Sequence, residues 1–124
     1  MGEGFKAKKL ARSLLRKLSE TASSQGNNIV LGTLEVRVRY IEYAKKGFLR
    51  KGSSYVVHSF PSVTEGEPVE AVIDVYEGGT LIATFLVSSD GRITFSGEGI
   101  MGETEAILLL GKLDEELASI SRHR

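Results

Sequence analysis

Two short turns divide the middle of the chain into segments that must pair with each other. Gly78-Gly79 separates the apolar runs 69–76 and 80–87, and Asp90-Gly91 precedes a third run, 92–96. Two-residue links of this kind are strong signals for β-hairpins. Strands joined by so short a link can pair only antiparallel. The sequence therefore predicts an antiparallel sheet.

Residues 29–43 predict another strand, because apolar and polar residues alternate along them. Strict alternation puts Leu34, Val36, Val38 and Tyr40 on one face, and Glu35, Arg37, Arg39, Ile41 and Tyr43 on the other. Lys45-Lys46-Gly47 is expected to turn the chain into a further strand that ends near Phe60, followed by a loop at 61–68. The result is a meander of about five strands.

Helices are predicted at both ends of this sheet. In residues 4–23 the apolar side chains occupy one arc and six Lys and Arg the opposite side. In residues 104–121 a seam repeats every three or four positions, as in a packed or coiled-coil helix. Its members are Ala106, Leu110, Leu113, Leu117 and Ile120. Close approach of another backbone would explain Gly111 in mid-helix. The predicted fold class is α+β (α-β5-α), a single domain over 1–124 with helices on one sheet face.

Composition excludes several classes of protein. No apolar run approaches the roughly 20 residues of a membrane span, and no secretory signal is present at the start. We therefore expect a cytoplasmic protein with no membrane partner. The chain has no cysteine, which excludes disulfides and thiolate chemistry. Its only amides are Gln25, Asn27 and Asn28, a scarcity typical of hyperthermophile proteins.

The charge of the chain is zero only as an average. Residues 1–62 contain twelve Lys and Arg against four Asp and Glu, and residues 63–124 contain four against twelve. The halves therefore carry +8 and −8. Such asymmetry indicates a polyanionic partner, or a basic half that pairs with the acidic one.

The sharpest motif is a G-x-G-x-x-G at Gly97, Gly99 and Gly102, between a predicted strand and helix. A dinucleotide fingerprint also needs a second parallel strand, and only a helix follows. A P-loop needs Lys-Ser/Thr where Glu103-Thr104 stands. We expect a flexible connection with Thr104 as the helix N-cap.

No catalytic or metal-binding constellation is evident. His58 and His123 are the only histidines, and neither has the neighbours of a triad or the spacing of metal ligands. The chain is therefore expected to be non-enzymatic, with no cofactor and no metal. A small-ligand pocket between sheet and helices is left open, because sequence does not reveal convergent polar groups.

A basic cluster with interleaved aromatic residues is the better candidate site. It contains Arg37, Arg39, Tyr43, Lys45, Lys46, Phe48, Arg50, Lys51 and Tyr55. Cations that follow a backbone, beside aromatic rings that stack on bases, suit a sequence-tolerant single-strand binder. In the alternative interpretation Tyr40, Phe48 and Tyr55 belong to the core and the cations pair with the acidic half.

The first helix also has two interpretations. A basic amphipathic helix can lie on an anionic lipid surface, although here only Phe5 could serve as an anchor. It can also cover its own sheet with the basic side toward solvent, and this role is favoured.

By layout the chain resembles the ThermoDBP-related single-stranded DNA-binding proteins of hyperthermophilic archaea. The resemblance covers most of the chain and depends on the basic first helix, the sheet with Arg37, Arg39, Tyr43, Arg50 and Lys51, and the leucine-rich last helix. It implies binding of single-stranded DNA or RNA over the sheet and oligomerisation through helices.

Two hypotheses result. In the first, a homo-oligomeric protein binds single-stranded nucleic acid with little sequence preference, with Arg37, Arg39, Lys45, Lys46, Arg50 and Lys51 on phosphates and Tyr43, Phe48 and Tyr55 on bases. The last helix then supports assembly or simply covers the sheet. In the second, the chain is a protein-interaction module whose +8 and −8 halves meet across an interface.

Overall fold

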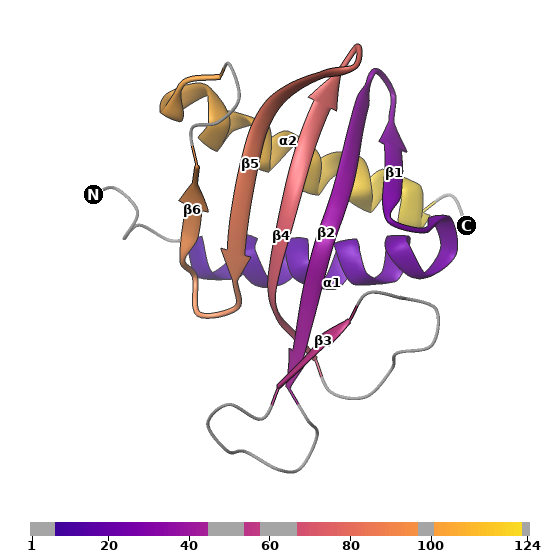
Figure 1. Ribbon diagram of the computed structural model, residues 1–124, viewed down its shortest axis with the longest axis vertical. Coiled ribbons are helices and arrows are strands. Elements are labelled where there is room, and N and C mark those ends of the chain that lie inside the picture. The colour runs from indigo at the N-terminus through magenta and orange to yellow at the C-terminus, as the bar shows by residue number, and fades with distance from the viewer. Residues whose placement is uncertain (1–6, 45–53, 58–66, 97–100, 123–124) are drawn as a thin grey trace.

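The computed structural model describes residues 7–44, 54–57, 67–96 and 101–122, and within them the chain forms two helices and six strands (Figure 1). In chain order they are α1 (Ala7–Gln25), β1 (Asn28–Leu31), β2 (Leu34–Ala44), β3 (Ser54–Val57), β4 (Pro68–Glu77), β5 (Thr80–Ser88), β6 (Ile93–Phe95) and α2 (Glu103–Arg122). The predicted α+β class is confirmed: an N-terminal and a C-terminal helix flank an antiparallel sheet.

The sheet has the order β1-β2-β4-β5-β6, and β3 pairs with β2 beside this path. All pairings are antiparallel. The turns at Gly78-Gly79 and Asp90-Gly91 join β4 to β5 and β5 to β6, as predicted, and all three glycines have positive φ. Because Ile41 pairs with both Val57 of β3 and Ala71 of β4, β3 and β4 lie on opposite edges of β2.

The prediction of one strand over residues 29–43 is wrong in one respect. A turn at Gly32-Thr33 divides this stretch into β1 and β2, which pair as a hairpin with Leu31 opposite Leu34. Gly32 has φ 65°, which a glycine adopts at little cost. This additional hairpin gives six strands where five were predicted.

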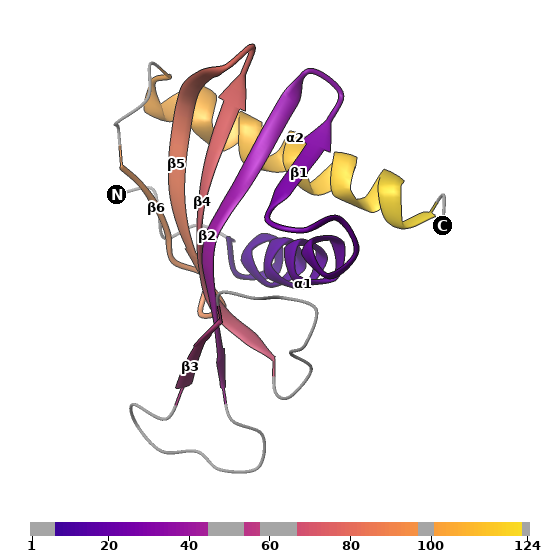
Figure 2. The ribbon, with the colours of Figure 1, turned by 45° about the vertical axis from the view of Figure 1, so that its right-hand side comes forward.

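Both helices lie on the same face of the sheet and cross its strands (Figures 1 and 2). The core fills the space between them and the sheet. Leu14 and Leu18 of α1, Phe85 of β5 and Leu113 of α2 are each no more than 1% exposed. No described helix or strand covers the opposite face of the sheet, which we call the open face.

A bulge in β2 changes which residues point to the core. The register between β2 and β4 shifts between Val38 and Tyr40. Leu34, Val36 and Val38 point to the helices before the shift, and Ile41 and Tyr43 after it, so all five are buried. One extra residue reverses the alternation, which is the ordinary effect of a bulge. The prediction that Tyr43 shares a face with Arg37 is therefore wrong.

The seam of α2 covers the sheet of its own chain. Ala106, Leu110, Leu113 and Leu117 are buried, so of the two predicted roles the covering one is observed. A Cβ at Gly111 would meet no described atom within 4 Å, so no described backbone makes the close approach expected there. Within the described residues, no helix is long and apolar enough to cross a membrane.

Candidate nucleic-acid interface

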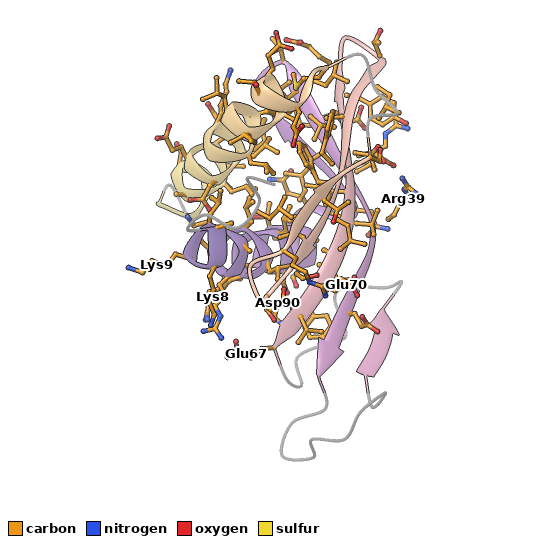
Figure 3. All side chains as sticks on the ribbon, turned by 90° about the vertical axis from the view of Figure 1, so that its left-hand side faces the viewer. Lys8, Lys9, Arg39, Glu67, Glu70 and Asp90 are labelled. Atoms are coloured by element: carbon orange, nitrogen blue, oxygen red, sulfur yellow. The ribbon has the colours of Figure 1, made fainter. Side chains whose placement is uncertain are left out.

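The open face carries the two arginines of β2 that the sequence singled out. Arg37 lies between the buried Val36 and Val38, so its side chain points away from the helices, and Arg39 projects from the same side in Figure 3. The side chains of Arg37 and Arg39 are 46% and 53% exposed. Both guanidinium groups therefore remain in contact with solvent.

Arg39 is held by Asp74 of β4. Its Nε and Nη2 donate to the two Asp74 carboxylate oxygens at 3.0 and 2.9 Å, and the Thr84 hydroxyl of β5 donates to Oδ1 at 2.7 Å. Burial raises the pKa of Asp74, but these hydrogen bonds outweigh burial and leave the pKa below its ordinary value. The carboxylate stays ionised and holds the planar guanidinium through two parallel hydrogen bonds.

Arg37 is held by a carboxylate and an aromatic ring. Its Nε donates to Glu35 Oε2 at 3.1 Å, and its guanidinium carbon lies 4.1 Å from the centre of the Tyr76 ring. This hydrogen bond and the negative charges nearby outweigh desolvation and raise the pKa of Arg37. Tyr76 is half-buried and was not predicted as a site residue. Because Ile73 and Val75 are buried, the alternation along β4 places Tyr76 on the open face. Its contact with Arg37, however, depends on the register between β2 and β4, which are far apart in the sequence.

The open face becomes acidic toward the end of β2. Glu42 and Glu70 are directly opposite each other on β2 and β4. The hydrogen bond between the two carboxyl groups, and then burial, raise the pKa of Glu70, while Arg92 acts in the opposite sense. Like charges on opposite strands disfavour double ionisation. On β2 the described cations of the open face are Arg37 and Arg39, and Arg92 adds a positive charge near Glu70.

The structure corrects the predicted role of one aromatic residue. Tyr43 is 3% exposed and its hydroxyl is hydrogen-bonded to Ser19 of α1, so its ring cannot stack on a base. Tyr55 lies in β3, where its backbone pairs with that of Tyr43, and its side chain is outside the description. The other predicted contacts, Lys45, Lys46, Phe48, Arg50 and Lys51, lie outside the described residues.

Ion pairs between the basic and acidic halves form inside the chain. Lys17 Nζ lies 3.1 Å from Asp114 Oδ1, Arg39 pairs with Asp74, and Arg16 Nη2 lies 3.6 Å from Glu67 Oε1. Ser13 also donates to Asp114, at 2.7 Å, so this carboxylate ties α1 to α2. Part of the predicted pairing between the halves is therefore intramolecular.

The basic side of α1 is solvent-exposed while its apolar side covers the sheet, as favoured from the sequence. Lys8, Lys9, Arg12 and Arg16 are exposed, and Leu14, Leu15 and Leu18 are buried. Lys8, Arg12 and Arg16 recur every four residues, so they form one row along the helix. We call these three residues the α1 row.

The glycine motif contributes a helix cap. Gly97 and Gly99 lie outside the described residues, and α2 begins at Glu103. The predicted N-cap at Thr104 is wrong, because Glu105 Oε1 accepts a hydrogen bond from the Gly102 N–H at 3.1 Å. The carboxylate thus takes a place that a phosphate would need at this terminus.

The described residues contain no group of three or more His, Cys, Asp or Glu that could hold a metal ion. In comparisons with known proteins, no protein-family model, no curated protein and no solved structure matches the chain. The resemblance to the ThermoDBP-related proteins therefore stays a prediction, and the functional argument depends on the site alone.

Proposed function

We propose that this is a non-enzymatic, cytoplasmic protein that binds single-stranded DNA or RNA, with little sequence preference, on the open face of its sheet. The observation that carries the proposal is the guanidinium of Arg37 over the Tyr76 ring, with Arg39 beside it on the open face of the antiparallel sheet. Aromatic and guanidinium planes stack on any base, and arginines bind phosphates.

The carboxylates beside the two arginines do not exclude phosphate contacts. An exposed ion pair is worth about 0–1 kcal/mol, and each pair here leaves guanidinium donors toward solvent because the arginines are about half exposed. Phosphate binding is also favoured by release of condensed counterions. In this proposal Arg37 and Arg39 contact phosphates and Tyr76 replaces Tyr43 as the stacking residue.

Further basic residues follow β2 in the sequence. Lys45, Lys46, Arg50 and Lys51 lie in the segment between β2 and β3, which contains no Asp or Glu. We propose that these residues extend the phosphate contacts. Phe48 and Tyr55 are proposed as additional stacking residues.

Binding should be measured by fluorescence anisotropy of a labelled oligothymidine at several salt concentrations. We expect the logarithm of affinity to fall linearly with the logarithm of salt concentration, and Arg39→Gln to reduce the slope by about 0.7, the value of one single-strand phosphate contact. Loss of the ring in Tyr76→Leu should weaken binding by about 1–3 kcal/mol, the worth of one stacked base.

Lys112→Gln is the matched control, because it removes one exposed cation from α2, on the other side of the sheet. It should leave the salt slope unchanged. Absence of binding at low salt, or an equal loss of affinity in Lys112→Gln and Arg39→Gln, would contradict the proposal.

A second candidate is self-association through the outer side of α2. Ile107 and Leu108 are 43% and 71% exposed, and Gly111 leaves open space beside them. An apolar contact of this kind resists salt, unlike the charge-driven association predicted from the two halves. Light scattering should then show an oligomer that persists at high salt and becomes monomeric in Leu108→Gln. A monomer in the unmodified protein at micromolar concentration would exclude this candidate.

A further inference from the structure

A small hollow lies where α1 passes the ends of β4 and β5. It is lined by Arg12, Arg16, Glu67, Pro68 and Ser89, and its volume is about 120 Å³. A single water needs roughly 10–15 Å³ of such volume, so the hollow has room for a tetrahedral oxyanion with some of its water. Two of its five lining residues belong to the α1 row, and Lys8, the third residue of that row, projects toward the same end of the sheet in Figure 3.

The walls of the hollow are held by the backbone. The Ser89 N–H donates to the Val69 carbonyl at 2.9 Å, which joins the ends of β4 and β5. At Gly91 a Cβ would lie 3.1 Å from the Lys8 Cα, so the first turn of α1 packs closely on the β5–β6 turn. The first residue of the α1 row is therefore packed against the β5–β6 turn, and the ends of β4 and β5 are joined beside it.

The two arginines of the hollow are only weakly engaged. Arg12 Nε donates to the Ser89 carbonyl at 3.5 Å, a long hydrogen bond that leaves its terminal nitrogens available. Arg16 Nη2 lies 3.6 Å from Glu67 Oε1, and these side chains are 63% and 75% exposed. An exposed ion pair of this length contributes little to stability. A stronger anion can displace the carboxylate.

We propose that this hollow binds a phosphate group between Arg12 and Arg16, and that Glu67 occupies it when no phosphate is present. A guanidinium group binds two oxygens of a phosphate in parallel, and two such groups at one hollow favour a phosphate over the single carboxylate. Glu67 then acts as an internal competitor that lowers the affinity for anions.

The source of the phosphate is the backbone of the nucleic acid, and this part of the inference depends on the proposed function. Pro68, which lines the hollow, is opposite Tyr43 near the end of β2. The hollow thus lies at the end of the sheet where the chain leaves β2 for β3. A nucleic acid bound on the open face would bring a backbone phosphate to the α1 row by passing Glu42 and Glu70 and turning around this end to the helix side of the sheet.

Inorganic phosphate is the first probe, titrated into the ¹⁵N-labelled protein and followed by NMR. We expect saturable shifts of the Arg12 and Arg16 Nε–H signals and of the Ser89 amide. Arg16→Gln should weaken phosphate binding roughly tenfold, and Glu67→Gln should strengthen it several-fold. Lys9→Gln is the control of equal charge change, because the Lys9 side chain points away from Glu67 in Figure 3. Equal effects of Lys9→Gln and Arg16→Gln, or no gain in Glu67→Gln, would overturn the site.

Labelled oligothymidine is the second probe and separates this inference from the proposed function. The Arg12→Gln/Arg16→Gln variant should lose roughly tenfold in affinity and lower the salt slope. If phosphate binds in the hollow and oligothymidine does not bind at all, the proposed function fails and the phosphate site stands. If oligothymidine binds equally to the variant and the unmodified protein, the hollow has no part in nucleic-acid binding.

Discussion

Replacing Tyr43 by alanine is expected to lower the free energy of unfolding by about 3–5 kcal/mol, the usual cost of removing a buried aromatic ring. The ring is 3% exposed and packs in the core under α1. Its hydroxyl is hydrogen-bonded to Ser19 across the sheet–helix boundary. The alanine variant would leave a cavity and a half-buried Ser19 hydroxyl that has lost its partner. Urea unfolding followed by circular dichroism measures the loss.

Two further variants separate the contribution of the Tyr43 ring to stability from that of its hydroxyl, and the cost of losing a core ring from that of losing a surface ring. Tyr43→Phe keeps the ring and should cost about 1 kcal/mol, the net worth of one hydrogen bond. Tyr76→Ala removes a ring of the open face that is only half-buried, and should cost clearly less than Tyr43→Ala. If Tyr43→Ala left stability unchanged and weakened oligothymidine binding, Tyr43 would be a surface stacking residue as first predicted, and its place in the core would be wrong.

The prediction about Tyr43 also shows what the sequence could reveal of this fold. Local signals predicted both helices and the hairpins at Gly78-Gly79 and Asp90-Gly91, since turn chemistry and hydrophobic period act over a few residues. The bulge in β2 has a local signal that strict alternation ignored. Within β2, apolar and aromatic residues stand at even positions from Leu34 to Tyr40 and at odd positions at Ile41 and Tyr43. That change of phase indicates one extra residue, and it places Tyr43 in the core.

The site was less predictable than the fold because its contacts join distant parts of the chain. Arg39 was predicted correctly as a cation of the sheet, but its partner Asp74 lies 35 positions away. The same register between β2 and β4 brings Tyr76 under Arg37. Alternation predicts which face a residue occupies, but the register between strands that are not joined by a short turn depends on the packing of the whole sheet.

Asp74 is expected to stabilise the fold and to weaken the proposed nucleic-acid binding, and the variant Asp74→Asn tests both effects. The carboxylate is 14% exposed, and it receives two hydrogen bonds from Arg39 and one from Thr84. At pH 7 the variant should lose about 1.5–3 kcal/mol of unfolding free energy, the range for hydrogen bonds to a charged group. The exposure of Arg39 keeps the loss below that of a fully buried pair.

The pH dependence of Asp74→Asn follows from the direction of the shift. The hydrogen bonds hold the pKa of Asp74 below its unfolded value of 3.8. Its contribution is therefore complete above that value and is lost as the pH falls through the folded pKa. The difference in stability between the unmodified protein and the variant should be constant at neutral pH and shrink below about pH 4. A difference that stays constant down to pH 2 would show that Asp74 acts without its charge.

The same variant is expected to strengthen nucleic-acid binding. Without the carboxylate, Arg39 keeps its charge, and a phosphate no longer competes with Asp74 for the guanidinium. Affinity for oligothymidine at low salt should rise roughly threefold to tenfold, since one competing negative charge is removed from the open face.

Asp114→Asn is the matched control, because it removes one carboxylate that bridges Lys17 and Ser13 on the helix side. If Asp114→Asn increased affinity as much as Asp74→Asn, only net charge would matter, and Arg39 would not be a contact residue. A gain confined to Asp74→Asn would instead show that Asp74 raises the free energy of unfolding and, through its ion pair with Arg39, weakens nucleic-acid binding.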